Sequence, residues 1–241
     1  MTYELKGKTA LVTGAARGLG LIIAEDLARN GAQVCGVDVR ADLLAEQMAR
    51  IGEQHGVQTL SIEADAAIES QVVASVGQLI AEWGRIDILV NNAGIRKVAP
   101  VAEITTAMWD EIHAVNLRGQ FLFTREVLKQ GMQQQNEGVL IFISSGSGRR
   151  GEKNSATYCA SKFGGIGFAE SVAQELKETK IRVTTIAPGM IWTPMAEESE
   201  VAHLGLDWLD PRHVSNAVLF CIQQDCDTII PEMHVYHRAQ I

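Results

Sequence analysis

The sequence predicts a single α/β domain built on a parallel β-sheet, and two observations carry this prediction. Short apolar runs, each long enough for one buried strand, alternate along the chain with longer segments whose apolar residues recur at helical spacing. No linker rich in proline or serine interrupts this alternation. Strands that alternate with helices pair in parallel through right-handed crossovers. We therefore expect one domain over residues 1–241, with its ligand site outside the carboxyl ends of the strands.

Composition and charge indicate a globular protein. Hydrophobic residues make up 46% of the chain and charged residues 21%, which is close to the globular average. The formal net charge of −8 disfavours a generic binder of nucleic acid or anionic membranes. No apolar run approaches the roughly 18 residues of a membrane span, and the N-terminus lacks the apolar core of a signal peptide, so we expect a cytoplasmic protein. The scattered cysteines and histidines predict no metal site.

The first predicted strand and helix are joined by a turn rich in glycine. The strand at residues 9–13 is an apolar run, and helical spacing follows from Gly18 until Asn30-Gly31 stops the helix. The glycines of the turn are Gly14, Gly18 and Gly20. Because they lack side chains, the backbone can approach a pyrophosphate, and the amides at the helix N-terminus can face its charge. The unit predicts a dinucleotide site, with a purely structural turn as the alternative.

The residue that ends the second strand predicts which dinucleotide is bound. This strand, at residues 33–37, is followed by Asp38, which lies 18 residues past Gly20. An acidic residue near this distance accepts hydrogen bonds from the adenine-ribose hydroxyls and repels a 2′-phosphate. Arg17 argues for the opposite preference, because a cation in the glycine turn can meet that phosphate. Since Asp38 has the more direct role, we predict NAD, with NADP as the alternative.

The remaining elements continue the alternation. We expect strands at residues 57–63, 86–90, 139–143, 181–187 and 228–235. The last of these should lie at the sheet edge, because Pro231 cannot donate to a ladder. We expect helices at residues 41–55, 68–83, 105–134 and 156–179, and another after Pro211. The helical pattern of residues 105–134 has two parts, and Asn116 lies near their junction. The segment from Met190 to about Asp207 shows no clear period.

A hydroxyl, a phenol and an amine in the second half of the chain predict acid–base chemistry. Tyr158 and Lys162 stand at i and i+4, so they share one face of the predicted helix. A free phenol titrates near pH 10, and a neighbouring lysine cation favours the phenolate and lowers that pKa. Ser145, at the end of the preceding strand, could hydrogen-bond a substrate carbonyl. These residues point to carbonyl reduction or alcohol oxidation, with a surface helix pair as the alternative interpretation of Tyr158 and Lys162.

Together the motifs resemble those of the short-chain dehydrogenase/reductase family over residues 5–235. The matching motifs, in order, are Thr13-Gly14-x-x-x-Gly18-x-Gly20, Asn91-Asn92-Ala93-Gly94, Asn116, Ser145, Tyr158-x-x-x-Lys162 and Pro188-Gly189. The resemblance implies a Rossmann fold, which is a doubly wound sheet of seven parallel strands with helices on both faces. It also implies hydride exchange between a nicotinamide and a carbonyl carbon. Members like this are usually homotetramers that pair the helices at 105–134 and 156–179, and a homodimer is the alternative.

The resemblance further implies a role for each matching residue. Tyr158 is the expected acid and base, Lys162 lowers its pKa and holds the nicotinamide ribose, and Ser145 orients the substrate oxygen. Asn116 is expected to hold a water in the proton relay. Asp65 and Ala66 are expected at the adenine, and Ile191 and Thr193 at the nicotinamide amide. The other expected cofactor contacts are Gly14, Arg17, Gly18, Leu19, Gly20, Asp38, Asn92, Ala93, Gly94, Pro188 and Gly189.

Basic residues that flank the predicted site are candidates for binding an anionic substrate. Arg96-Lys97 follows the Asn-Asn-Ala-Gly turn, and Arg149-Arg150 follows Ser145. Guanidinium groups pair well with carboxylates, phosphates and sulfonates. The alternative, which the sequence alone favours, is loop charge exposed to solvent or an intersubunit salt bridge.

The chain departs from the family pattern at two places. Residues 231–241 replace the Val-Asp-Gly-Gly-like ending of many relatives, and the substrate lid at about 190–208 is short. Acidic lid residues would disfavour an anion if they faced inward, and these are Glu197, Glu198 and Glu200. Apolar lid residues could form a wall of the site, and these are Trp192, Met195 and Trp208.

Three functions are compatible with these observations. We favour an NAD-dependent oxidoreductase that interconverts a secondary alcohol and a ketone of a small polar substrate. The second is a 3-oxoacyl thioester or hydroxysteroid oxidoreductase of the same fold, which the short lid and the acidic balance disfavour. The third is a catalytically inactive protein that senses NAD, which the intact catalytic motif disfavours.

Overall fold

The computed structural model describes residues 3–198 and 207–240, and a sheet of seven parallel strands runs through its centre. The strands are β1 (Thr9–Thr13), β2 (Gln33–Asp38), β3 (Thr59–Glu63), β4 (Ile88–Asn91), β5 (Glu137–Ile143), β6 (Lys180–Pro188) and β7 (Glu232–Val235). Their order across the sheet is β3-β2-β1-β4-β5-β6-β7. The chain order reverses where β1 pairs with both β2 and β4, so the carboxyl end of β1 is the topological switch point.

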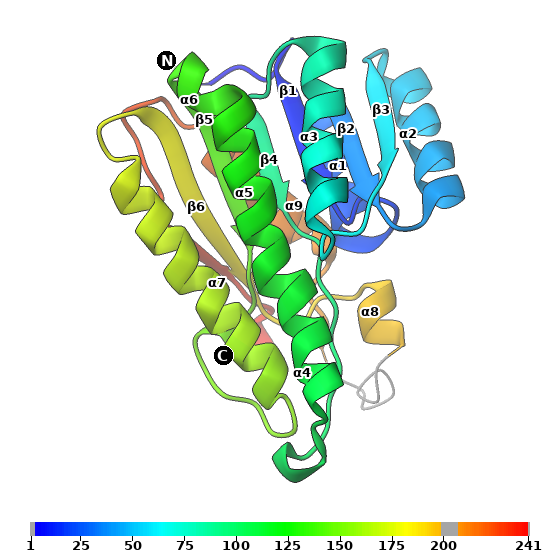
Figure 1. The fold of residues 1–241 in the computed structure, drawn as a ribbon, viewed down its shortest axis with the longest axis vertical. Coiled ribbons are helices and arrows are strands. Elements are labelled where there is room, and N and C mark those ends of the chain that lie inside the picture. Colours follow the sequence, from blue (N-terminus) through cyan, green and yellow to red (C-terminus); the bar gives the residue numbers. More distant parts are fainter. Residues whose placement is uncertain (1–2, 199–206, 241) are drawn as a thin grey trace.

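Helices cover both faces of this sheet (Figure 1). The helices are α1 (Gly18–Arg29), α2 (Ala41–His55), α3 (Glu69–Trp83), α4 (Thr106–His113), α5 (Gly119–Val127), α6 (Gln133–Gln135), α7 (Ala156–Glu175), α8 (Pro194–Glu197) and α9 (Pro211–Ile222). Apolar residues of α1, α2 and α9 pack on one face, and those of α3, α5 and α7 pack on the other. The doubly wound α/β fold predicted from the sequence is confirmed.

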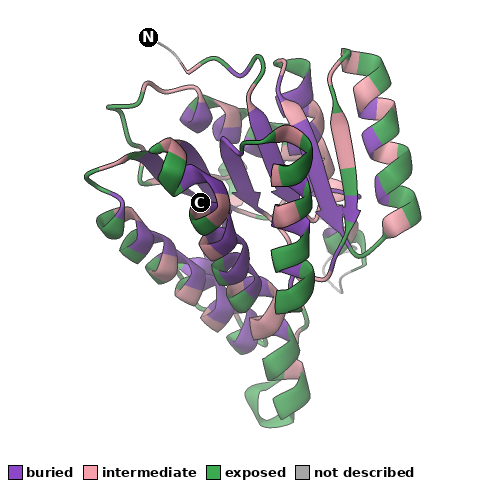
Figure 2. Ribbon diagram, turned by 45° about the horizontal axis from the view of Figure 1, so that its top comes forward, coloured by how far each residue is buried: buried purple, intermediate pink, exposed green. Residues whose placement is uncertain are grey.

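The central strands are buried on both sides, which explains their continuous apolar runs (Figure 2). In β1, Ala10 and Val12 face the core under α1, whereas Leu11 faces the core under α3 and α5. The strand β5 alternates in the same way, with Val139 and Leu140 on opposite faces. Because successive side chains of a strand point to opposite faces, one apolar run supplies both cores.

The long helix predicted at residues 105–134 is one continuous rod with two wider turns. The segments η2 (Ala114–Arg118) and η3 (Leu128–Met132) are π-helical and join α4, α5 and α6 end to end. Asn116 lies inside the first π turn, close to the predicted junction. Such turns frequently occur at functional sites, because they re-aim a side chain without ending the helix.

Several boundaries differ from the prediction, each for a local reason. Helix α7 ends at Glu175 rather than at Thr179, because the Thr179 hydroxyl donates to the Leu176 carbonyl and turns the chain. The last strand begins at Glu232 rather than at residue 228, just after Pro231, and β7 lies at the sheet edge as predicted. The predicted lid is described only in part, and Glu200 lies outside the described residues. Among the described helices, none has the length and apolar character of a membrane span.

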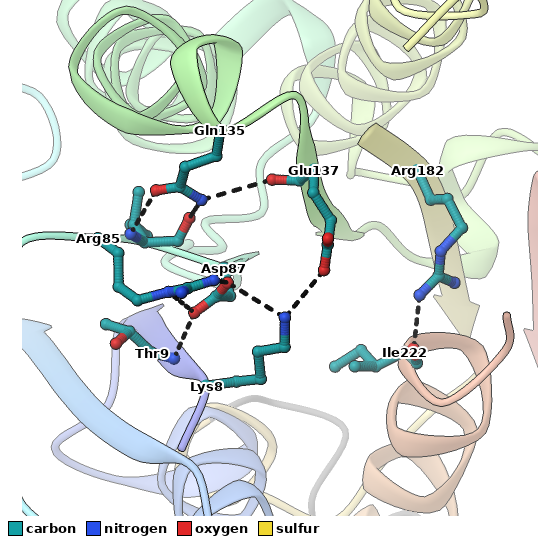
Figure 3. Close-up of polar contacts among 9 residues, drawn as sticks. Lys8, Thr9, Arg85, Asp87, Gln135, Glu137, Arg182 and Ile222 are labelled. Carbon is teal, nitrogen blue, oxygen red and sulfur yellow. Dashed lines mark hydrogen bonds and ion pairs between the residues drawn. The ribbon is translucent and has the colours of Figure 1, made fainter. Parts of the chain in front are cut away.

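The amino edge of the sheet carries a dense polar network (Figure 3). Asp87, which is fully buried, accepts hydrogen bonds from the Thr9 amide and from Arg85 Nε, both at 2.9 Å. Lys8 Nζ lies 3.6 Å from the same carboxylate. Arg182 donates to the Ile222 carbonyl at 2.6 Å, near the end of α9. Buried charges in this network are therefore partnered and help to hold the strands in register.

Candidate active site

A cavity of about 890 Å³ opens at the carboxyl end of the strands. It is lined by the β1–α1 turn, the ends of β2, β4 and β5, the first turns of α7 and the segment after β6. Every cofactor residue predicted from the sequence lines this cavity, and so do Ser145, Tyr158 and Lys162. The fold thus brings together groups that are far apart in the chain, as expected at the carboxyl edge of an open α/β sheet.

The glycine turn leaves a bare backbone surface at the N-terminus of α1. Gly14 and Gly18 adopt positive φ values of 68° and 62°, which favour glycine. A Cβ atom on Gly20 would lie 2.1 Å from the Gly14 carbonyl oxygen, so a side chain there cannot fit. Because the turn lines a cavity large enough for a dinucleotide and its glycines leave the backbone bare, these residues fit a nicotinamide cofactor.

The Asn91-Asn92-Ala93-Gly94 turn is tied directly to the glycine turn. Asn92 Nδ2 donates to the Thr13 carbonyl at 2.8 Å, and the Thr13 hydroxyl accepts from the amides of Asn92 and Ala93 at 3.0 and 2.9 Å. Two motifs that are about 80 residues apart therefore form one rigid wall of the cavity, with β1 and β4 as neighbours behind it.

Two ion pairs surround the position predicted to select the cofactor. Asp38 is buried, and its carboxylate accepts from the Ala16 amide and from Arg40 Nη1, both at 3.1 Å. Arg17 makes a bidentate pair with Glu198, the residue after α8. Arg17 and Glu198 are 181 residues apart in the chain, so this pair joins the glycine turn to the lid. The sequence predicted Arg17 in the site but carried no signal of its partner.

Asn116 organises the site from behind the cavity. Its side chain is fully buried, and its Oδ1 accepts from the Ile95 amide at 2.8 Å. Its Nδ2 donates to the Ile95 carbonyl at 2.9 Å and to Ser161 Oγ at 3.1 Å. Both amide hydrogens are therefore engaged by the protein, and the side chain does not line the cavity. These contacts tie the loop after β4 to α7, and the water-holding role expected for Asn116 stays a prediction.

Tyr158 and Lys162 lie beside Ser145 at the end of β5, almost buried in the first turns of α7. The exposed fractions of Tyr158 and Lys162 are 8% and 4%. Lys162 Nζ donates to the Ile143 carbonyl at 2.9 Å and lies 5.7 Å from the centre of the Tyr158 ring. The i and i+4 spacing on α7, together with the end of β5, produces the convergence predicted from the sequence.

Burial dominates the electrostatics of these residues. It raises the pKa of Tyr158 to about 12, although a hydrogen bond with Ser145 and the charge of Arg96 act to lower this pKa. Burial also lowers the pKa of Lys162 to about 8. The Tyr158 pKa is therefore raised rather than lowered in the protein chain by itself, and the lowering expected from Lys162 stays a prediction. Desolvation outweighs the favourable charges, and the cation that acts on the phenol is Arg96.

The structure separates the candidate substrate residues. Arg96 lines the cavity, half-buried, and its guanidinium carbon lies 5.9 Å from the centre of the Tyr158 ring. Arg149 is exposed outside the cavity, where it pairs with Glu232 at 2.6 Å and with Glu170 at 2.8 Å. Arg150 is also exposed outside the lining. A role of Arg149-Arg150 in binding substrate therefore gains no support, and the exposed positions agree with the alternative of loop charge at the surface.

The described parts of the lid are held in place by contacts that the sequence did not predict. Trp192 does not line the cavity but packs edge-to-face on Trp208, with ring centres 5.2 Å apart. Gln240 Nε2 donates to the carbonyls of Met190 and Asp207 at 2.9 and 2.7 Å, and its Oε1 accepts from the Met190 amide at 3.0 Å. One side chain therefore ties both ends of the lid. In the sequence, the departure of the C-terminal segment from the family pattern indicated that this end of the chain is unusual, but it did not predict this contact.

No cluster of ligand-type side chains suitable for a metal ion occurs among the residues that the structure describes. The cavity presents the phenol of Tyr158, the ammonium group of Lys162, the hydroxyl of Ser145, the guanidinium of Arg96 and the bare glycine turn. This set can bind a nicotinamide cofactor and move a proton at a substrate oxygen.

Comparisons with known proteins agree with this chemistry. The chain is 36% identical over 197 residues to a D-threitol dehydrogenase of Mycolicibacterium smegmatis, covering 82% of this chain and 75% of the relative. It is 34% identical to a 3-oxoacyl-(acyl-carrier-protein) reductase of Vibrio cholerae, covering 96% of this chain and 97% of the relative. A metagenomic short-chain oxidoreductase crystallised in complex with NADP superposes with a TM-score of 0.85 at 30% identity, covering 97% and 98% of the two chains.

The model of the short chain dehydrogenase family matches residues 8–203, which is most of the chain. The fold, the identity to characterised relatives and this match agree, and they confirm the resemblance found in the motifs. The chain therefore belongs to the short-chain dehydrogenase family and is an oxidoreductase that acts on the CH–OH groups of alcohols or on the corresponding ketones.

Proposed function

We propose that this protein is an NAD-dependent oxidoreductase that interconverts a secondary alcohol and a ketone of a small polar substrate. The observation that carries this proposal is the convergence of Ser145, Tyr158 and Lys162 in one cavity with the glycine turn and Asp38. A bound nicotinamide supplies or accepts the hydride. The chain itself has to bind the substrate, orient its oxygen and move one proton.

In this proposal Tyr158 exchanges that proton with the substrate oxygen. During reduction its hydroxyl donates the proton as the carbonyl carbon receives the hydride, and during oxidation the phenolate takes the proton from the alcohol. Ser145 orients the same oxygen, and Lys162 holds the nicotinamide ribose. Because burial raises the pKa of Tyr158 to about 12, the phenol is protonated at neutral pH. This state suits reduction, whereas oxidation becomes faster as the pH rises.

The preference for NAD rests on the charges at the end of β2. Asp38 presents a carboxylate at the cavity, and the nearby cations Arg40 and Arg17 are paired with Asp38 and Glu198. A 2′-phosphate there would meet Asp38 and would have to compete for both arginines. We predict that Asp38→Ala weakens NAD binding and relaxes the discrimination against NADP at least about tenfold in kcat/KM. Unchanged selectivity in steady-state assays with both cofactors would assign the preference elsewhere.

The substrate class is supported by the relatives and by the short lid. The D-threitol dehydrogenase named above points to small hydroxylated substrates. The alternative, a 3-oxoacyl thioester reductase, is favoured by one observation, the likeness to the Vibrio cholerae enzyme along nearly its whole length. Hydroxysteroid oxidation and NAD sensing without catalysis are further alternatives that no observation on the structure favours.

The decisive experiment measures NADH formation at pH 9 with a panel of polyols, sugars, hydroxy acids, cyclic alcohols and hydroxysteroids, with NADP in parallel. Acetoacetyl thioesters are tested in the reductive direction. Turnover of a small alcohol with NAD supports the proposal, and turnover of only the thioester with NADPH favours the alternative. Binding of NAD without turnover of any compound would favour the sensor.

We further propose that the protein acts as one catalytic domain and assembles as a homotetramer or homodimer. Phe121 of α5 and Phe163 of α7 are 39% and 45% exposed. A groove of about 550 Å³ is lined by residues of α4, η2 and α5 and by Phe168 of α7. Apolar side chains exposed on adjacent helices are typical of an interface. Light scattering after size exclusion would reveal the assembly, and a monomer at micromolar concentration would contradict it. The cytoplasmic location stays a prediction.

A further inference from the structure

We propose that the substrate is a short hydroxy acid or oxo acid, whose carboxylate binds to Arg96 while its oxygen lies at Tyr158. This inference rests on the proposed function, since it names the substrate class of the same site. The inference is based on the pattern of ion pairs among the charged side chains that line the cavity.

Most of the charged residues that line the cavity are already neutralised by a neighbour. Arg17 pairs with Glu198, Arg40 with Asp38, and Lys97 with Glu111. Lys162 is engaged by the Ile143 carbonyl, and the Asp65 carboxylate accepts from the Ala67 amide. Within residues 3–198 and 207–240, Arg96 has no ion pair with a carboxylate. Near Tyr158, the charged side chains that line the cavity without an ion pair are therefore Arg96 and Lys162, and both are cations.

Arg96 is held in place rather than extended into solvent. Its Nη2 donates to the buried Ser155 hydroxyl at 3.2 Å, just before α7 begins. The backbone of the same loop is anchored as well, because the Ala99 amide donates to the Asn154 carbonyl at 2.8 Å. Since one hydrogen bond occupies only part of the guanidinium fork, donors remain for a bidentate contact with a carboxylate.

The position of Arg96 limits the length of the substrate. Its guanidinium carbon lies 5.9 Å from the centre of the Tyr158 ring. A molecule that contacts both groups must therefore carry its carboxylate close to the reacting carbon, as short 2- or 3-hydroxy acids do. A long acyl chain would have to place its charge elsewhere. This geometry distinguishes the proposed substrates from acyl thioesters and steroids.

Negative charges near the site are accounted for. Glu111 is paired with Lys97, and Glu198 with Arg17, so neither is free to repel an anion. Glu152 does not line the cavity, although its charge acts on Tyr158 in the opposite sense to that of Arg96. The competing role for Arg96 is to tune the phenol without touching substrate, and the experiment must separate these roles.

The experiment compares matched acids and esters in three proteins. The substrates are 3-hydroxybutyrate with its methyl ester, and lactate with its amide, and the proteins are the wild type, Arg96→Gln and Arg150→Gln. We expect the wild type to prefer the acids. We expect Arg96→Gln to lower kcat/KM about 10- to 100-fold for the acids, mainly through KM, and less than about threefold for the neutral partners. Arg150→Gln is the matched control, because its side chain lies outside the cavity.

Binding supplies a readout that does not depend on turnover. Calorimetry with malonate in the presence of NAD should give a Kd that rises at least about tenfold in Arg96→Gln and stays constant in Arg150→Gln. Equal losses for acid and ester, together with a shifted pH profile, would show that Arg96 only tunes Tyr158 and would overturn the inference. Turnover of neutral alcohols without any preference for acids would overturn it and leave the proposed function intact. Silence with every alcohol and both cofactors would overturn the proposed function itself.

Discussion

Two buried tyrosine hydroxyls lie at opposite edges of the sheet, and burial raises the pKa of each to about 12. At the amino edge, Lys8 and Arg182 flank the ring of Tyr3, whose hydroxyl has no hydrogen-bond partner among the described residues. At the carboxyl edge, Tyr158 faces a cavity beside Ser145 and Lys162. A perturbed pKa alone therefore does not mark the reactive phenol. The reactive phenol is instead identified by an adjacent cavity and by neighbouring groups that can exchange its proton.

The buried charges at these edges differ in the same way. Asp87 at the amino edge is surrounded by Arg85, Lys8 and the Thr9 amide. Lys162 at the carboxyl edge is nearly as buried but has a backbone carbonyl as its partner, and burial lowers its pKa to about 8. Satisfied charges hold the strands together, whereas an incompletely compensated charge keeps a group ready to bind or react. Stability and reactivity are thus placed at opposite ends of the same strands.

The largest effect should come from exchanging the phenols for phenyl rings. Tyr158→Phe removes the proton donor, and we expect kcat to fall at least about a thousandfold with folding intact. Tyr3→Phe removes an unpartnered hydroxyl, so kcat should stay unchanged and the free energy of unfolding should stay constant or rise. Initial rates and thermal unfolding measure both. Turnover in Tyr158→Phe would contradict the acid–base assignment.

Breaking the network at the amino edge should affect stability alone. Asp87→Ala leaves Arg85 and the Thr9 amide without their acceptor, and we expect a loss of about 3 kcal/mol in the free energy of unfolding. The kcat of the folded fraction should not change, since the cavity lies at the other edge. Urea denaturation and assays at low temperature test this. A large loss of kcat with little loss of stability would contradict the assignment of stability to the amino edge and of reactivity to the carboxyl edge.

Lys162→Met should stabilise the folded state, whereas most substitutions of buried residues destabilise it. At pH 7 the buried ammonium destabilises the folded state, because a pKa shift from 10.5 to about 8 corresponds to about 3 kcal/mol, so its removal should raise the free energy of unfolding by at most this amount. Between pH 8 and 10.5 the unfolded chain binds more protons than the folded one, because the folded pKa is about 8 against 10.5. Wild-type stability therefore gains from this group as the pH rises, and the difference between the proteins shrinks. Denaturation at pH 7 and pH 10 shows this, while kcat falls in the variant.

The smallest effect concerns the exposed pair between the glycine turn and the lid. The side chains of Arg17 and Glu198 are 34% and 60% exposed, so solvent screens their attraction. Glu198→Gln frees Arg17 for a 2′-phosphate, and we expect kcat/KM with NADP to rise about two- to fivefold at low salt. The gain should vanish in Arg17→Ala/Glu198→Gln and at high salt. An equal gain with NAD would assign the effect to the lid.

Much of the fold was predictable because its signals are local. The apolar run at residues 9–13, the glycine turn and the helix from Gly18 form one unit within a short stretch of chain, and β1 and α1 match it. The boundaries that differed depend on contacts beyond that range. An example is β4, predicted from residue 86 but beginning at Ile88, after Asp87, whose side chain joins the amino-edge network.

The candidate site divides in the same way. The sequence by itself determined the parallel α/β class, the glycine turn and the pairing of Tyr158 with Lys162, because each depends on local patterns along the chain. Only the tertiary structure decided that Arg96 faces the cavity while Arg149 does not, that Gln240 ties the lid, and that burial raises the Tyr158 pKa. These outcomes depend on which distant segments exclude water from a side chain. Residue spacing does not reveal which side chains lose contact with water, because that loss depends on how distant segments pack against one another.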